Sequence, residues 1–300
     1  MPVDVNRPGP WNHRNLTARG TRFHVALAGP EAPSGSGVLT LLIHGFPECW
    51  WTWRHVIPAL AQAGHRVAAL DLRGFGGSDR PPSGYDLVTL AQDIAAVVRS
   101  LGHERAMVIG AGLGGQVAWA LPHVAPDLTT AIIPVGAPHP LALRSLRSRA
   151  LSGPALQYAS LQIPGLAERR LRSRSALEGL LRSWAGPHTR EAVAEEAPYY
   201  AELLSRPGAA HSALEPLRNL MLSRAETAAL ERPVTVPVLS VQGQLDPVQP
   251  AQAYARDTHH VTGNLHQATI RRSGHFPQEE APAELVRALI PFLADVAPAV

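Results

Sequence analysis

The sequence has no lysine, a single cysteine and no apolar run long enough to cross a bilayer, and each absence narrows what the protein can be. All 27 basic residues are arginines, and the formal net charge is only +3. The sequence pI near 9.5 therefore reflects the high pKa of arginine rather than a strongly basic surface. This balance gives little support to nucleic-acid binding. With Cys49 alone, no disulfide can form within the chain.

The N-terminal residues MPVDVNRPGPWNHRN also lack the apolar core of a signal peptide. Together these absences predict a cytoplasmic protein that makes no contact with a membrane. What the sequence does contain, 45% hydrophobic and 17% charged residues, is typical of a packed globular chain. A length of 300 residues allows one large domain or two modest ones.

Strand-like and helix-like segments alternate along most of the chain. Residues 12–29 predict a hairpin with Arg19-Gly20 near its turn. Further strands are predicted at 38–45, 65–72, 105–111, 129–136, 235–243 and 266–274, and helices at 53–64, 87–102 and 281–296. Such alternation predicts an α/β fold, in which helices cover both faces of a mostly parallel sheet.

The alternation stops near Pro140 and resumes near residue 233. The residues between are rich in Arg, Leu, Ala and Ser and predict short helices. We therefore expect one α/β core formed by residues 1–140 and 233–300, with a helical cap formed by residues 141–232.

The stretch VIGAGLGGQVAWALP at 108–122 predicts a strand, a tight glycine turn and a helix. This is the arrangement of a nucleophile elbow, where the reactive side chain stands at the middle of the turn. The middle residue here is Gly112, which has no side chain with which to attack. The elbow position is thus predicted, but without its nucleophile.

Three other stretches have chemical meaning at strand ends. HGFPECWWTWR at 44–54 would place the N–H of Phe46 at the top of the sheet, and the N–H of Leu113 begins the helix after the elbow. Two such N–H groups can stabilise a developing oxyanion. Asp246 and then His275 follow later strands, which is the chain order of the acid and base in a hydrolase triad. They are the predicted catalytic residues.

Residues 44–82, HGFPECWWTWRHVIPALAQAGHRVAALDLRGFGGSDRPP, resemble the α/β-hydrolase family of soluble epoxide hydrolases and haloalkane dehalogenases. APHP at 137–140, LQIPGLAE at 161–168 and GHFPQEEAP at 274–282 are similar to the same family. The resemblance extends from the first hairpin to the last helix. It implies an α/β-hydrolase fold with a helical cap, and His275 in the catalytic loop.

The departures from this family concern the reactive groups. The family has Gly-His-Asp-Trp at the elbow, where the Asp forms a covalent ester, but positions 110–113 here are Gly-Ala-Gly-Leu. The family also uses two cap tyrosines to hold the epoxide oxygen. The first would fall at about Gln157, one residue from Tyr158, and the second is replaced within Pro216-Leu217-Arg218. An ester-forming mechanism is therefore not expected.

Each candidate has a simpler interpretation. His275 could be an ordinary buried histidine and Asp246 a turn former before proline. Cys49 could act as a substitute nucleophile, although a small buried residue is the expected role. The arginines within 144–149 and 169–174 could attract anions, but are typical of the solvated face of helices. An engineered loss of the nucleophile is also an alternative, although it would not explain changes at three of the four elbow positions.

The sequence thus favours an enzyme that uses His275 and Asp246 for general-base chemistry of hydrolase, lyase or cyclase type on a small, largely apolar molecule. We expect the pocket to be lined by residues of the oxyanion loop, which begins the stretch 44–54, by residues just after it and by the cap, namely His44, Pro47, Trp50, Trp51 and Tyr158. At least two of the tryptophans Trp50, Trp51 and Trp53 are expected instead to anchor the helix to the core. No cofactor is expected, and adjacent His259 and His260 do not suggest a metal site. The alternative is a pseudoenzyme that binds a small ligand without turning it over.

Overall fold

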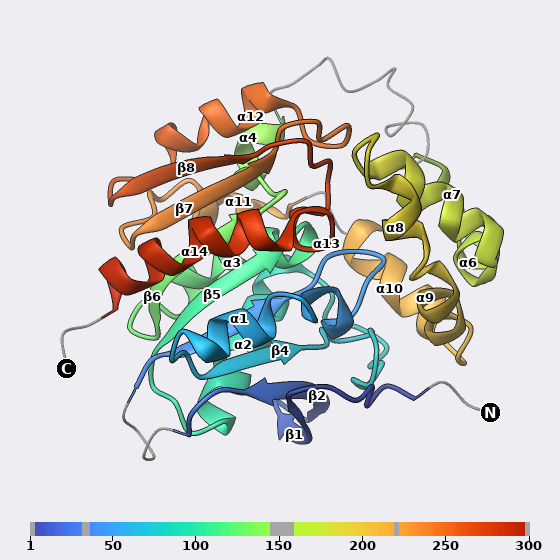
Figure 1. Cartoon of the computed structure of the whole chain (residues 1–300), viewed down its shortest axis with the longest axis horizontal. Coiled ribbons are helices and arrows are strands. Elements are labelled where there is room, and N and C mark those ends of the chain that lie inside the picture. Colours follow the sequence, from blue (N-terminus) through green and yellow to red (C-terminus); the bar gives the residue numbers. More distant parts are fainter. Residues whose placement is uncertain (1–3, 32–36, 145–158, 219–221, 298–300) are drawn as a thin grey trace.

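A computed structural model describes residues 4–31, 37–144, 159–218 and 222–297 (Figure 1). The strands are β1 (Asn12–Ala18), β2 (Thr21–Ala28), β3 (Leu39–Ile43), β4 (Val67–Leu70), β5 (Ala106–Ala111), β6 (Thr129–Val135), β7 (Val238–Gly243) and β8 (Leu265–Ile270). They form an eight-stranded sheet in the order β1-β2-β4-β3-β5-β6-β7-β8. Pairing is parallel from β4 to β8 and antiparallel at β1 and β2. The predicted α/β-hydrolase fold is confirmed.

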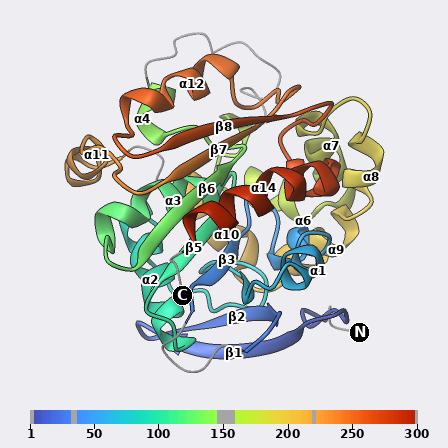
Figure 2. The ribbon, with the colours of Figure 1, turned by 60° about the vertical axis from the view of Figure 1, so that its left-hand side comes forward.

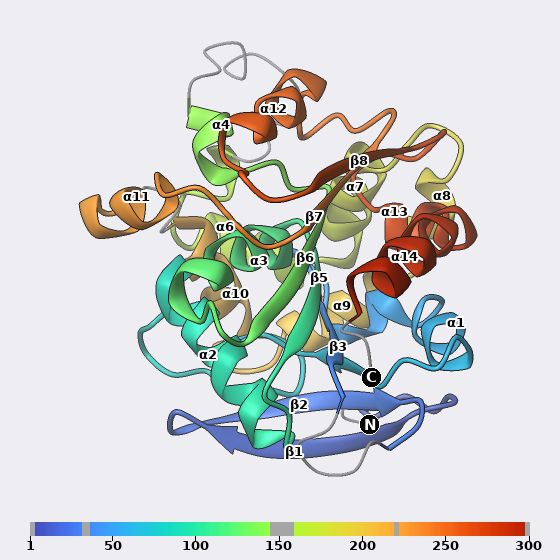
Figure 3. The same cartoon turned by 90° about the vertical axis from the view of Figure 1, so that its left-hand side faces the viewer.

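The helical segments are η1 (Trp50–Trp53), α1 (Ile57–Gln62), α2 (Leu87–Ser100), α3 (Leu113–Val124), α4 (Pro140–Arg144), α6 (Leu166–Arg172), α7 (Arg174–Trp184), α8 (Arg190–Ala194), α9 (Ala197–Leu204), α10 (Ala209–Arg218), α11 (Arg224–Leu230), α12 (Ala251–Ala255), η3 (Asp257–His259), α13 (Pro277–Glu280) and α14 (Pro282–Val296). Seen along the sheet, α1 and α14 lie on one face and α2 and α3 on the other (Figure 3). Within the described ranges, no helix combines the length and the apolar character that crossing a membrane requires.

The central strands are continuous apolar runs because helices cover both of their faces. Every residue of β3, β4 and β5 is buried. Strand β1, at the sheet edge, instead alternates between buried and exposed positions in its second half. This is the pattern expected for buried parallel strands beside an antiparallel edge.

The N-terminal hairpin forms where the sequence predicts it. Arg19 and Gly20 connect β1 to β2 with φ angles of 50° and 72°. Two successive residues with positive φ match the right-handed twist of the flanking strands. The predicted helix at 53–64 is shorter than expected, because η1 precedes it and α1 begins at Ile57, with a proline in its first turn.

Helices α6 to α10 lie together beyond one end of the sheet (Figure 1). They are the helical segment that interrupts the α/β alternation between β6 and β7. Helix α11, at the end of the same segment, lies apart from them and contacts α3 and α4 (Figure 2). The division into a core and a cap at 141 and 232 stays a prediction, with α11 packed against α3 of the core and against α4 at the boundary.

A buried ion pair fixes α2 to the loop that follows β4. The Arg73 guanidinium donates two hydrogen bonds to the Asp93 carboxylate, at 2.7 and 3.0 Å, and both residues are buried. Arg19, in the hairpin turn, donates a third at 3.1 Å. One carboxylate thus connects β1, the loop after β4 and α2.

We predict that Asp93→Asn destabilises the protein by about 3–5 kcal/mol, because it leaves a buried guanidinium without its counter-charge. Arg174→Gln removes a partner from an ion pair whose arginine side chain is 70% exposed, and it should cost under about 1 kcal/mol. Urea unfolding of both variants measures the difference. Equal losses of unfolding free energy in the two variants would contradict the structural role given to Asp93.

Candidate active site

Gly112 stands at the junction of β5 and α3, with φ 47° and ψ −111°. A positive φ of this kind strains a residue that carries a Cβ but costs glycine little. The backbone therefore retains the sharp elbow that the sequence predicts. The first turn of α3 begins directly after it.

The two predicted catalytic residues come together in the structure. His275, which follows β8, and Asp246, which follows β7, have their Nδ1 and Oδ2 atoms 3.0 Å apart. Both side chains are almost fully buried, at 7% and 2% exposed. The other carboxylate oxygen of Asp246 accepts hydrogen bonds from the N–H groups of Val248 and Gln249. Asp246 is therefore held in place by its own loop, and it orients the imidazole.

The imidazole faces the elbow. A Cβ built on Gly112 would lie 3.5 Å from His275 Nε2, the ring nitrogen that Asp246 does not contact. Nothing nearer surrounds that point apart from the chain neighbours of Gly112. The basic nitrogen is thus directed at the place where a nucleophilic side chain would begin.

The loop after β3 lies beside the same point. The Cα of Gly45 is 3.6 Å from the Cβ position of residue 112, so the N–H of Phe46 and the N–H of Leu113 belong to adjacent backbone segments. Leu113 is the first residue of α3, where the N–H has no partner within the helix. Both predicted oxyanion donors therefore lie next to the elbow, and their role stays a prediction.

The cap contributes a residue that the sequence does not suggest. The backbone carbonyl of Trp184, at the end of α7, accepts a hydrogen bond of 2.9 Å from the N–H of His275. The Trp184 ring also lies edge-on to the imidazole, with centroids 5.6 Å apart. The end of α7 therefore contacts both the backbone and the ring of His275. Trp184 and His275 are 91 positions apart in the chain, so no local sequence pattern connects them.

Glu280 fixes the loop that carries His275. Its carboxylate accepts hydrogen bonds from the N–H groups on either side of the histidine, those of Gly274 at 2.8 Å and Phe276 at 3.0 Å. It also accepts one from the N–H of Gly186 at 2.7 Å and one from the Thr189 hydroxyl at 2.6 Å. The carboxylate therefore joins the histidine loop to the segment between α7 and α8. The motif GHFPQEEAP contains Glu280, but the sequence alone does not indicate a role for it.

The residues predicted to line the pocket have the following surroundings. Trp50 is fully buried, and its ring packs against Trp11, His13 and His24. Its indole N–H donates a hydrogen bond of 3.1 Å to the carbonyl of Val5, so Trp50 anchors the N-terminal segment. Its place in the pocket stays a prediction.

Trp51 and His44 also have partners other than a ligand. The Trp51 indole donates to Glu196 of the segment before α9, and the Arg7 guanidinium lies 4.2 Å from its ring centre. His44 is fully buried, and its Nε2 accepts a hydrogen bond from the N–H of Leu72. Both side chains therefore hold loops together, and their role in lining the pocket stays a prediction.

Pro47 lines a small cavity of about 10 Å³ together with Phe75 of the core and Tyr200 and Leu203 of α9. It therefore lies at the contact between the oxyanion loop and the cap. Tyr158, and the arginine run that starts at residue 144, lie outside the residues whose side chains the structure describes. Their predicted roles stay predictions.

The substitute sites considered from the sequence gain no support. Burial raises the pKa of Cys49 well above its usual value, which disfavours the thiolate that a nucleophile requires. Among the described residues, no group of three or more His, Cys, Asp or Glu side chains is placed to hold a metal ion. His260 instead stacks on His139, with ring centroids 3.9 Å apart.

Glu48 is a buried carboxyl near the site that the sequence did not single out. Its Oε1 accepts a hydrogen bond of 2.7 Å from the Thr52 hydroxyl, and the Gln278 amide lies 3.3 Å away. Burial, reinforced by the nearby Glu279, raises its pKa to about 8. The raised pKa favours the protonated form of the Glu48 carboxyl at neutral pH, and this carboxyl lies close to the loop that carries Phe46.

The chain is similar in sequence to a known protein family and to epoxide hydrolases. A model of the alpha/beta hydrolase fold family matches residues 40–282. Epoxide hydrolase B of Mycobacterium tuberculosis is 43% identical over 128 residues, which cover 42% of this chain and 35% of that protein. The matched region therefore covers only about a third of the length of that relative.

Longer matches cover nearly the whole chain. Epoxide hydrolase 4 of Mus musculus is 31% identical over 96% of this chain and 81% of that protein. Among solved structures, Cfl2 from Burkholderia cenocepacia superposes with a TM-score of 0.81 and 29% identity, covering 94% of this chain and 96% of that one.

The raised pKa of Glu48 predicts a pH dependence of stability. The folded state favours the neutral carboxyl, so this contribution is fully present below about pH 4.5 and is lost as the pH rises through about 8. Glu48→Gln removes the ionisation. Relative to the variant, the wild type should lose up to about 1.4 kcal/mol per pH unit in this window. Denaturant unfolding between pH 4 and pH 8.5 tests this; parallel curves would show that Glu48 ionises normally.

Proposed function

Given that this chain belongs to the α/β-hydrolase family, we propose that it is an enzyme whose base, His275, acts without a covalent ester. The observation that supports this most directly is the distance of 3.5 Å between His275 Nε2 and the Cβ position of residue 112. Asp246 orients the imidazole of His275, and the ring faces a residue with no side chain, which supports a base that acts on water or on the substrate itself.

In this mechanism, His275 takes a proton from a water molecule or from the substrate itself. Asp246 accepts the hydrogen bond from Nδ1–H, which leaves Nε2 as the basic atom and stabilises the imidazolium that forms. The assigned tautomer follows from this contact, because an ionised carboxylate can only accept. The reacting group would occupy the space that a side chain at 112 would otherwise fill.

The anion that forms would be stabilised by the N–H groups of Phe46 and Leu113. Such donors contribute most when they are fixed before the reaction starts. Here one lies at the start of a twelve-residue helix and the other in a loop whose backbone touches the elbow. Hydrolysis by direct attack of water, elimination, ring closure and proton abstraction beside a carbonyl are all compatible with this arrangement.

The substrate class is a small, largely apolar molecule held between the core and the cap. The resemblance to epoxide hydrolases supports this class, and the aromatic surroundings of His275 agree with it. Trp184 and Phe276 both lie against the imidazole, with ring centroids 5.6 and 5.4 Å from it. Neither ring supplies a charge that would recognise a strongly polar substrate.

The second candidate is a pseudoenzyme that binds such a molecule and turns nothing over. Gly112 favours the pseudoenzyme, because the residue at the elbow has no side chain that could attack a substrate. The buried His275–Asp246 pair favours the enzyme, because a buried polar pair costs free energy that ligand binding alone does not require. Turnover measurements on small apolar esters, lactones and epoxides separate the two candidates.

For a substrate that the wild type hydrolyses, we predict that His275→Ala abolishes turnover and that Asp246→Asn lowers kcat by up to about four orders of magnitude, through loss of the tautomer and of the charge. A single turnover with excess enzyme in ¹⁸O-labelled water should place the label in the product. Label retained by the protein would mean that a covalent ester forms. Unchanged ligand affinity in both variants, with no turnover by the wild type, would favour the pseudoenzyme.

We predict further that the wild type does not open simple epoxides and that Gly112→Asp restores little of this activity. The new side chain would have the carboxylate, but at a backbone conformation that costs a non-glycine residue about 1–3 kcal/mol. The thermal unfolding temperature should therefore fall slightly. Turnover of styrene oxide by the variant at the rate of an ordinary epoxide hydrolase would show that Gly112 alone accounts for the missing activity.

A further inference from the structure

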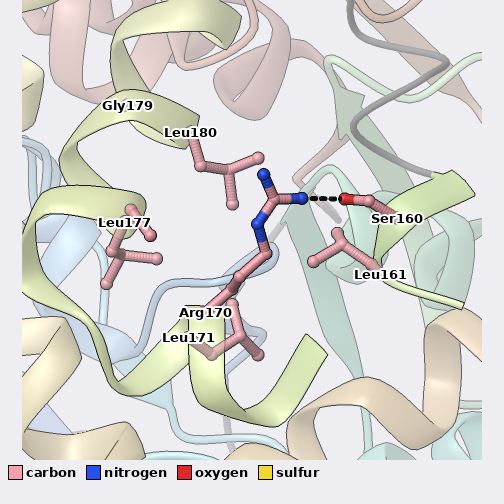
Figure 4. A pocket seen from close by; sticks show the side chains of 8 residues that line it. Ser160, Leu161, Arg170, Leu171, Leu177, Gly179 and Leu180 are labelled. Carbon is pink, nitrogen blue, oxygen red and sulfur yellow. Dashed lines mark hydrogen bonds between the residues drawn. The ribbon is translucent and has the colours of Figure 1, made fainter. Parts of the chain in front are cut away.

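A separate cavity lies inside the cap. It has a volume of about 230 Å³ and is formed by the end of the segment before α6, by α6 itself and by α7. Four leucines form most of its wall, and they belong to the buried core of the cap: Leu161, Leu171, Leu177 and Leu180. Figure 4 shows these side chains arranged around a single charged group, the guanidinium of Arg170.

Arg170 is exposed, and among the described residues no carboxylate is paired with its guanidinium. Within the described residues, its hydrogen bond goes to a neutral group, the Ser160 hydroxyl, at 2.6 Å (Figure 4). The two carboxylates on the same helices are already engaged. Glu168 pairs with Arg218 at 2.9 Å, and Glu178 pairs with Arg174 at 2.9 Å. Arg170 is therefore an available cation at the side of an apolar cavity.

Two exposed apolar side chains precede Arg170 in the chain. Among the described residues three large hydrophobic side chains are exposed, and two of them are Ile163, just before α6, and Leu166, its first residue. Leu166 is four residues before Arg170 and so lies on the same face of the helix. An exposed apolar side chain on the helix face that carries the charged lining residue is compatible with a binding surface.

We infer that this cap cavity binds a single-chain amphiphile with an anionic head, such as a medium-chain alkyl carboxylate. The tail would lie among the four leucines, where it leaves water. The carboxylate would accept hydrogen bonds from Arg170, whose planar guanidinium matches a carboxylate better than it matches a hydroxyl. Ser160 would then hold the guanidinium from its other side.

The volume sets the length of the tail. An apolar cavity of about 150 Å³ binds benzene, a ligand of six carbons, and this cavity, at about 230 Å³, is larger. A chain of about six to eight carbons occupies such a space, with its head at the opening. A two-tailed phospholipid is too large for it.

This site is distinct from the candidate active site. Its lining residues lie between 160 and 180, and none of Gly112, Asp246 or His275 is among them. Binding in the cap therefore does not depend on whether His275 acts as a base. Because Trp184 ends the same helix that lines the cavity, an occupant would lie about one turn of α7 from the residue that contacts His275.

The test is calorimetric titration of the purified full chain with octanoate. We expect saturable binding at one site. Arg170→Gln should weaken octanoate binding about tenfold or more, because a charge-assisted bond is lost. Arg169→Gln is the matched control: it removes the same charge from the adjacent residue of α6, which does not line the cavity, and it should leave the affinity unchanged. Octylammonium and acetate, which lack the matching head and the tail respectively, should not bind.

A second variant tests the cavity itself. Ala176, which lines it from α7, can be changed to Phe to fill the space, and octanoate binding should then be lost while circular dichroism shows the fold retained. Octanoate affinity unchanged in both Arg170→Gln and Ala176→Phe would place the anion elsewhere and overturn the inference. Binding to phosphatidylglycerol vesicles without binding to free octanoate would also overturn it, because it would show a lipid surface rather than a single chain to be the ligand.

Discussion

The candidate site depends on one close approach of backbone to backbone, where the turn after β5 meets the end of β3. A Cβ on Gly114 would lie 2.5 Å from the carbonyl oxygen of Ile43 and 2.7 Å from that of His44. Only glycine allows α3 to begin so near to the neighbouring strand. This contact sets the loop of Phe46 beside the elbow, and with it the two N–H groups and the space that His275 faces.

The histidine is positioned by two independent supports. Asp246 holds the ring from the core, through a contact that links the ends of β7 and β8. Glu280 and Trp184 hold the backbone of its loop, and both connect it to the cap. A shift of α7 would therefore move the base relative to the elbow. The segment at the end of α7 and before α8 therefore takes part in holding the loop that carries His275.

The elbow and the histidine are held in place by different parts of the fold. At Gly112 the backbone has a positive φ, and the close packing of β3, β5 and α3 holds the turn in this conformation. Asp246 orients the His275 ring, and the other ring nitrogen faces the point where a side chain at 112 would begin. In the proposed mechanism, the substrate or a water molecule would supply the reacting atom at that point.

The sequence by itself determined the fold class, the hairpin at Arg19-Gly20 and the convergence of Gly112, Asp246 and His275, because residues that follow parallel strands meet at one edge of the sheet. It could not show which way the ring of Trp50 points, because the conformation of η1 decides this. Nor could it identify Trp184, Glu280 or Glu48. Their roles arise from contacts between distant segments and from burial, which only the packing of the cap and the oxyanion loop on the core decides.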